Sequence, residues 1–266
     1  MIDVFRKAVA FKSRLNKTPT SIIRSRLLNI DADISDFFVF SLGEYETVFV
    51  AENNLALLLG EHVSCTHKFH FFDASGVLCG VYEVENEEFH YRLKIEEGMV
   101  GGVNLGGFTH HVSYSDTILS QYNNKMLGIS FQHRGYTGYR KTGLDEFSYV
   151  HGNFGAMYLS KYHGIRSLAR SRSKHTYTPQ FVVKPGFEYD LFFINPTNKK
   201  MLVNFVLIKN GSTKTLSQAY LNPRATCKVQ IDNIDSESNV AWETSLPIGR
   251  CVVFERRGDH FDVFHS

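Results

Sequence analysis

The sequence lacks the cysteine spacing of a zinc-binding motif, and it lacks any apolar run long enough to cross a membrane. Its four cysteines stand far apart, and no two of them form a CxxC pair. No apolar stretch reaches the ~18 residues of a membrane span, and no secretory hydrophobic region follows Met1. These absences exclude a zinc ribbon and predict a cytoplasmic protein whose cysteines are buried free thiols.

The sequence also lacks a large excess of positive or negative charge, since the formal net charge is only +2. No global field therefore favours nucleic acid as a partner. Basic residues nevertheless crowd the first positions, and residues 2–28 carry a loose apolar stripe of helical period. This pattern predicts a short basic helical segment within residues 1–35. We expect it to pack on the rest of the protein or on a partner subunit; contact with an anionic membrane is the alternative.

Tryptophan is nearly absent, whereas the other two aromatic residues are abundant: one Trp stands against 22 Phe and 13 Tyr. Phe and Tyr favour the pleated, half-buried surface of a strand. From residue 36 onward apolar and polar residues alternate, and Gly, Asn and Asp turns separate the alternating runs. The chain is therefore predicted to be mainly β.

The alternating pattern occurs twice. Residues 69–95 align with residues 205–231 without a gap, and the alternation stays in phase throughout. Two shorter matches follow the same order along the chain: residues 48–50 with 191–193, and residues 131–135 with 254–258. Repeated order of this kind predicts an internal duplication.

A unit of about six or seven short strands suits a two-sheet sandwich. The duplication therefore predicts two tandem β-sandwich modules behind the helical segment. The first module is expected over residues 36–145 and the second over residues 146–266.

Short segments of the second module carry a family resemblance: residues 156–159, 189–195, 221–233, 246–248 and 252–254, with Arg257. In these segments the chain resembles the sensory rhodopsin transducer family, a group of small bacterial β-sandwich proteins. The resemblance implies a non-enzymatic module that binds small molecules such as sugars and assembles into oligomers. The chain differs from that family in its duplication, its basic front end and its histidine-bearing connection.

Histidines are the main candidate metal ligands, although the sequence contains no HxH or HExxH motif. Adjacent residues of a strand face opposite sides, so His110 and His111 cannot chelate one ion together. A metal site would need one of these two residues together with His133, His151 and a carboxylate such as Asp116 or Asp145. Hydrogen-bonded structural histidines are the simpler interpretation, and no metal or other cofactor is expected.

The connection over residues 132–163 mixes flat rings with multi-donor side chains. Sugar recognition uses this combination, because rings cover the CH-rich face of a sugar while polar groups bind its hydroxyls. Paired arginines also suit a carboxylate or phosphate. The candidate ligand-binding residues are His133, Arg134, Tyr136, Tyr139, Arg140, His151 and Asn153. A tyrosine-rich packing surface between the modules is the alternative.

These observations predict a non-catalytic protein that binds a carbohydrate or another small polar molecule at the junction of two β-sandwich modules. The expected partners are that ligand and, in a homo-oligomer, further copies of the chain. Two alternatives stay open. One is a structural or assembly subunit that uses the aromatic surface as a protein interface, and the other is a metal-assisted enzyme with a histidine site.

Overall fold

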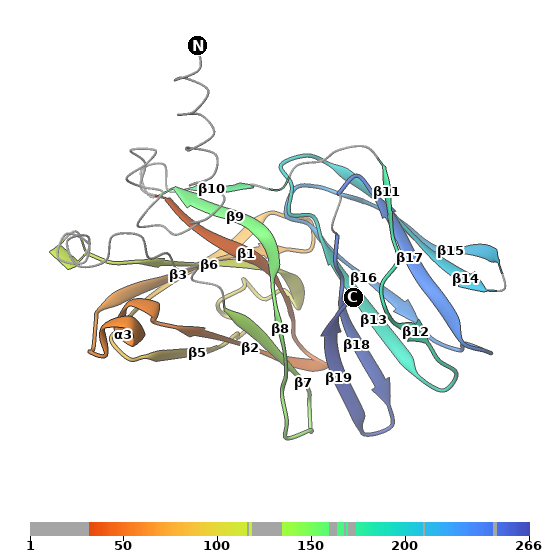
Figure 1. The fold of residues 1–266 in the computed structure, drawn as a ribbon, viewed down its shortest axis with the longest axis horizontal. Helices are drawn as coiled ribbons and strands as arrows, with labels where there is room; N and C mark the ends of the chain where they lie inside the picture. The colour runs from red at the N-terminus through yellow and green to blue at the C-terminus, as the bar shows by residue number, and fades with distance from the viewer. Residues whose placement is uncertain are drawn as a thin grey trace, which may run out of the picture.

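The computed structural model describes residues 32–115, 117–118, 135–159, 164–167, 169, 174–209, 211–246 and 249–266. The basic helical segment predicted for residues 2–28 lies outside them. Within the described residues the prediction of a mainly-β fold is confirmed, because nineteen strands accompany one short helix. The strands form two sandwiches that lie side by side (Figure 1).

The first sandwich consists of two antiparallel sheets. Sheet I has the strand order β10-β9-β1-β6-β3-β4, and sheet II has the order β5-β2-β7-β8. Helix α3 (Asn54–Leu59) follows β2, and the Asn53 side chain caps it by accepting a hydrogen bond from the Ala56 amide. The strands are β1 (Ala32–Ser41), β2 (Tyr45–Glu52), β3 (Cys65–Asp73), β4 (Leu78–Asn86), β5 (His90–Lys94), β6 (Leu105–Ser113), β7 (Tyr136–Lys141), β8 (Ser148–His151), β9 (Asn153–Leu159) and β10 (Gly164–Ser167).

The second sandwich also consists of two antiparallel sheets. Sheet III has the order β11-β17-β14-β15, with β12 paired to β17, and sheet IV has the order β16-β13-β18-β19. The strands are β11 (His175–Tyr177), β12 (Val182–Val183), β13 (Glu188–Ile194), β14 (Met201–Lys209), β15 (Ser212–Leu221), β16 (Thr226–Ile231), β17 (Ser238–Thr244), β18 (Val252–Arg257) and β19 (His260–His265).

The two sandwiches share one connectivity. Strand β2 lies between β5 and β7 as β13 lies between β16 and β18, and the hairpin β3–β4 pairs with β6 as β14–β15 pairs with β17. The aligned stretches 69–95 and 205–231 fall on these corresponding strands. The duplication itself remains a prediction, which the shared connectivity supports.

The boundary between the sandwiches lies later than the predicted division after residue 145. Strands β8, β9 and β10 belong to sheets I and II, so the first sandwich runs to Ser167 and the second begins with β11 at His175. Strand β1 likewise begins at Ala32, inside the segment predicted to be helical. The local pattern could not place either limit, because β1 and β9 are distant in sequence and pair only in the folded chain.

The third sequence match also shifts. Residues 131–134 lie outside the described residues. When residues 48–50 are set against 191–193, as in the sequence match, Tyr45 corresponds to Glu188. Their strand partners are Lys141 and Arg256, so these two residues occupy corresponding positions. The counterpart of Arg256 is therefore not found in residues 131–135. A five-residue match cannot fix a register, whereas backbone pairing does.

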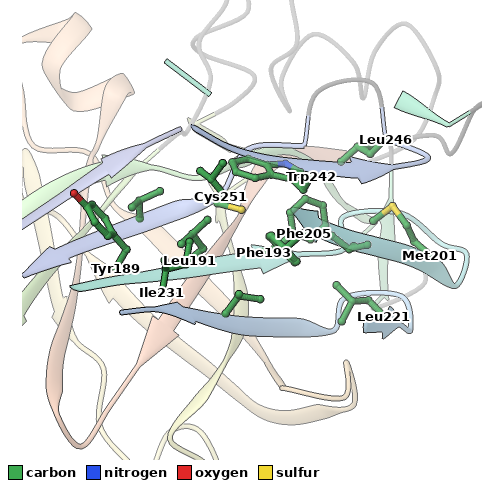
Figure 2. Close-up of a cluster of buried hydrophobic side chains, with 14 of the residues drawn as sticks. Tyr189, Leu191, Phe193, Met201, Phe205, Leu221, Ile231, Trp242, Leu246 and Cys251 are labelled. Atoms are coloured by element: carbon green, nitrogen blue, oxygen red, sulfur yellow. The ribbon is translucent and has the colours of Figure 1, made fainter. Parts of the chain in front are cut away.

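Each sandwich has its own apolar core. Figure 2 shows the core of the second sandwich, where Trp242, Phe205 and Phe193 pack among aliphatic side chains from both sheets. In the first sandwich Phe49 lies against Phe69 and Phe108, with ring centroids 5.4 and 5.7 Å away. Burial of side chains of this size contributes about 1.5–3 kcal/mol each, so these cores hold the sheet pairs together.

A third cluster, here called the junction core, joins the two sandwiches. In β13 the side chains of Leu191 and Phe193 face the second sandwich, whereas Phe192 and Ile194 face the first. A strand with both faces buried has a continuous apolar run, which the Leu-Phe-Phe-Ile sequence provides. The junction core comprises Phe37, Val39, Tyr45, Phe72, Tyr139, Val150, Ala156, Ile165, Phe192, Ile194, Val252, Phe254 and Val263.

A buried ionic cluster lies beside the junction core. Asp190 has no exposed surface, and its carboxylate accepts a hydrogen bond of 2.7 Å from the Tyr45 hydroxyl of the first sandwich. Lys228 Nζ lies 2.8 Å and Arg256 Nη2 lies 3.3 Å from the same carboxylate, so its charge is compensated. Arg256 also reaches Glu44 of the first sandwich at 2.7 Å. The ionic cluster thus fixes how the two sandwiches are placed.

Candidate functional site

The candidate ligand-binding residues of the sequence analysis do not converge on one site. His133 and Arg134 lie outside the described residues. Tyr136 and Arg140 project from the solvent face of sheet II, while Tyr139 between them projects inward. This alternation follows from the period of two in a strand.

Tyr139 is part of the junction core. Its side chain has no exposed surface, its hydroxyl donates a 2.6 Å hydrogen bond to the Val39 carbonyl, and its ring lies 4.7 Å from that of Phe254. Burial raises the pKa of the hydroxyl well above its ordinary value. Tyr139 therefore holds the sandwiches together and offers no surface to a ligand.

His151 and Asn153 also connect the two sandwiches. The ring of His265 lies 4.4 Å from that of His151, and its Nε2 donates to the His151 carbonyl. The Asn153 amide donates a 3.1 Å hydrogen bond to the Arg250 carbonyl. His151 thus fastens the end of sheet II to sheet IV, where strands β8 and β19 lie side by side (Figure 1), and Asn153 fastens the start of β9 in sheet I to the segment just before β18.

The candidate metal ligands are equally dispersed. His110 packs in the first sandwich, where a 2.8 Å hydrogen bond joins it to His67. His111 projects from the opposite face of sheet I, 5.3 Å from the ring of Tyr158. His151 lies at the junction. Across the described ranges no three potential ligands are grouped in a way that could hold a metal ion.

Exposed aromatic rings meet planar polar groups on the solvent face of sheet II. Tyr136 is 53% and Tyr149 is 42% exposed, although both carry large rings. Gly138 pairs with Tyr149, and a Cβ atom at this glycine would overlap the Tyr149 ring, which therefore lies directly over the backbone. We call this surface the tyrosine face; it comprises Tyr136, Tyr149, Phe147, Arg140, Arg92, Lys94 and Glu46.

Ion pairs and cation–π contacts fix the polar groups of the tyrosine face. Arg140 Nη2 lies 2.8 Å and Lys94 Nζ lies 3.2 Å from the Glu46 carboxylate. The hydrogen bond from Arg140 and the Lys94 charge hold the pKa of Glu46 below its ordinary value. The guanidinium groups of Arg92 and Arg140 lie 5.2 and 4.6 Å from the centre of the Phe147 ring.

Sequence reasoning selected two members of the tyrosine face, Tyr136 and Arg140, as ligand-binding candidates. It noted Tyr149 in the same connection without selecting it, and it missed the members on β2 and β5. Glu46 and Arg92 stand on β2 and β5, far from residues 132–163 in the chain. The alternation of β2 and β5 was the only sequence signal for Glu46 and Arg92. Once the two strands are paired, it places these residues on the face of sheet II that also carries Val48 and Lys94. Sequence alone did not reveal that pairing.

A concave region lies between the sandwiches. It is a cleft of about 800 Å³, here called the junction cleft, formed by the β3–β4 turn and β10 of the first sandwich and the β13–β14 and β15–β16 turns of the second. Its polar lining residues are Ser75, Ser167, Thr197, Asn198, Asn222 and Arg224.

No helix in the described ranges is long and apolar enough to cross a membrane. No family model matches the chain. No curated protein matches it either.

Several solved structures match with low TM-scores. A beta-glucuronidase from glycoside hydrolase family 2 has a TM-score of 0.21 and 9% identity, over 86% of this chain and 23% of that one. The infectious bursal disease virus Gx strain structure has a TM-score of 0.17 and 8% identity, over 88% and 55%. The major pilin of Streptococcus pyogenes has a TM-score of 0.17 and 11% identity, over 81% and 83%. The chain thus spans less than two thirds of the first two, and none of these likenesses carries a functional argument.

Proposed function

We propose that the chain is a non-catalytic carbohydrate-binding protein whose ligand lies on the tyrosine face. The observation that carries the proposal is the exposure of Tyr136 and Tyr149 beside fixed planar polar groups on an open sheet. The proposal moves the expected ligand away from the junction, where apolar side chains fill the space between the first sandwich and sheet IV.

The tyrosine rings suit the apolar side of sugars. Exposed rings that project from a flat sheet can each cover the CH-rich face of one pyranose. Tyr136 and Tyr149 are diagonal neighbours on paired strands, a relation that sets side chains about 7–8 Å apart. One oligosaccharide can therefore contact both rings.

The polar groups suit sugar hydroxyls. The guanidinium of Arg140 supplies donors and the Glu46 carboxylate supplies acceptors, and their 2.8 Å ion pair orients both before a ligand arrives. Such preorganisation lowers the entropic cost of binding. A mixed set of donors and acceptors favours a glycan over a uniformly charged polymer.

The same geometry favours binding over hydrolysis. A glycosidase needs a carboxyl group that holds a proton near neutral pH, which requires a raised pKa. Arg140 and Lys94 instead keep the Glu46 carboxylate ionised.

Glycan binding is tested with oligosaccharides on wild type and Tyr136→Ala. We expect a glycan array to identify a ligand for the wild type. Because stacking on the Tyr136 ring contributes to the binding free energy, calorimetry should give at least about tenfold weaker binding for the variant, about 1.4 kcal/mol. Tyr220→Ala is the matched control, because Tyr220 is 67% exposed on β15, outside the tyrosine face.

Two outcomes would overturn the proposal. One is equal loss of glycan binding in both variants. The other is no glycan binding by the wild type together with a change of oligomer size in Tyr136→Ala, measured by light scattering, which would make the tyrosine face a protein interface.

A further inference from the structure

The junction cleft is built by backbone contacts between the two sandwiches. The hairpin tip at Gly76 approaches the Pro223 carbonyl so closely that a Cβ atom there would overlap it. Next to this contact the Thr226 amide donates a 3.1 Å hydrogen bond to the Ala74 carbonyl. Two turns from different sandwiches are thus locked together and form one wall of the cleft.

Arg224 lines the cleft in a constrained conformation. Its φ of 67° lies in the left-handed region, which residues other than glycine seldom adopt. Hydrogen bonds hold the turn, since the Arg224 amide donates to the Asn195 carbonyl at 2.9 Å and the Ala225 amide donates to the Asn222 carbonyl at 3.1 Å. Backbone strain of this kind often accompanies a functional site.

The Arg224 guanidinium is half-buried among neutral groups. Its Nη2 donates a 2.7 Å hydrogen bond to the Ile165 carbonyl, and its centre lies 5.1 Å from the Phe72 ring. Burial lowers the pKa of Arg224. The ion pairs formed by the described residues include none to Arg224, whereas Arg256 is paired with Glu44, Glu188 and Asp190.

The Arg224 charge is also felt by a buried histidine nearby. Burial lowers the pKa of His70 to about 3, and the charges of His111, Lys68 and Arg224 contribute to the same shift. A half-buried cation costs free energy unless an anion neutralises it. Arg224 is the only ionisable side chain among the residues that line the junction cleft, so a cation without an ion pair faces this space.

From these contacts we infer that the junction cleft binds a small polar molecule through an oxyanion, a carboxylate or phosphate group, held by the guanidinium of Arg224. A guanidinium suits such groups because its planar donors match two oxygens at once. Asn222, Ser167 and Asn198 line the same cleft and offer donors to the remainder of the molecule. The site is distinct from the tyrosine face and does not depend on the proposed function.

Inorganic phosphate and citrate are the probes. We expect each to raise the melting temperature of the full chain saturably, and calorimetry to give one site. The two probes distinguish phosphate from carboxylate chemistry, and binding of either one supports the site. Arg224→Met keeps an apolar stem against Phe72 but removes the charge, and we expect at least about tenfold weaker binding. Arg224→Lys should retain part of the affinity.

Arg257→Met is the matched control, because the Arg257 guanidinium also lies over an aromatic ring, 5.1 Å from the centre of Phe187, but outside the cleft. If Arg224→Met does not fold, Asn222→Asp replaces it. This exposed position adds a carboxylate at the lip of the cleft and should weaken anion binding by a similar factor.

The inference is overturned if neither probe binds the wild type. It also fails if Arg224→Met and Arg257→Met bind alike, or if Asn222→Asp leaves affinity unchanged. Glycan binding in Arg224→Met and phosphate binding in Tyr136→Ala report the two sites separately, so the failure of one proposal leaves the other standing.

Discussion

At the residue scale, two arginines of the second sandwich have opposite environments. Burial alone would lower the pKa of Arg256, but the Asp190 carboxylate and other negative groups outweigh it and raise the pKa. Arg224 has no such partner among the described residues, and its pKa is lowered. Composition gives both residues the same charge, so only their neighbours separate a structural arginine from a candidate anion ligand.

Buried histidines make stability depend on pH. The folded pKa is about 3 for His70 and about 4 for His265, mainly because of burial. In the unfolded chain both histidines take up a proton near their ordinary pKa of about 6.5. The unfolded state therefore binds more protons below that pH, and stability present above pH ~6.5 is lost as the pH falls.

We expect the free energy of unfolding, measured by urea denaturation, to fall between pH 6.5 and 5, where ordinary carboxylates stay largely ionised. His70→Asn should make this slope shallower. His260→Asn should leave it unchanged, because the His260 side chain is 52% exposed. An identical slope in wild type and His70→Asn would contradict the assignment.

At the scale of elements, β13 is the central strand of the molecule. Its odd and even positions supply two different cores, and it carries Asp190 of the ionic cluster. The burial of both faces explains why its apolar run is continuous, whereas β5 and β16 alternate in exposure. Strand β13 therefore couples the packing of the second sandwich to that of the first.

Phe192→Ala is expected to lower the free energy of unfolding by about 3–5 kcal/mol, because it leaves a cavity in the junction core. The Phe192 side chain has no exposed surface, and its ring lies 4.6 Å from that of Phe254. Phe187→Ala, at a partly exposed position before β13, should cost clearly less. If chemical denaturation gave equal losses of unfolding free energy for the two variants, burial in the junction core would add no stability beyond that of a partly exposed position.

At the scale of the whole molecule, the two sandwiches form one packed unit. Sheet IV is covered by sheet III on one face and by the first sandwich on the other. The ionic cluster and the contact of Gly76 with the β15–β16 turn add polar and backbone contacts across the same junction. The sandwiches are therefore expected to unfold together.

Calorimetry should show a single transition for the full chain. A fragment of residues 174–266 should aggregate or remain unfolded, because it would expose Phe192, Ile194, Val252 and Phe254 to water. A monomeric fragment that melts sharply at the temperature of the full chain would contradict this expectation.

Part of the candidate site was visible in the sequence. The mixture of rings and donors in residues 132–163 drew attention to Tyr136 and Arg140, which do lie together on the tyrosine face. Tyr139 lies in the same tyrosine-rich segment, yet its side chain is part of the junction core. Composition cannot separate the two tyrosines, because the face of a strand residue depends on which sheet covers it.

The sequence by itself determined the period of two, the turns and hence the two β-sandwiches, because alternation and turn chemistry act over a few residues. Tertiary structure alone decided the late boundary at Ser167, the junction core and the pairing that sets Glu46 beside Arg140. It also decided that Arg224 lines the junction cleft while Arg256 is neutralised. These features join residues far apart in the chain, and local patterns carry no information about such contacts.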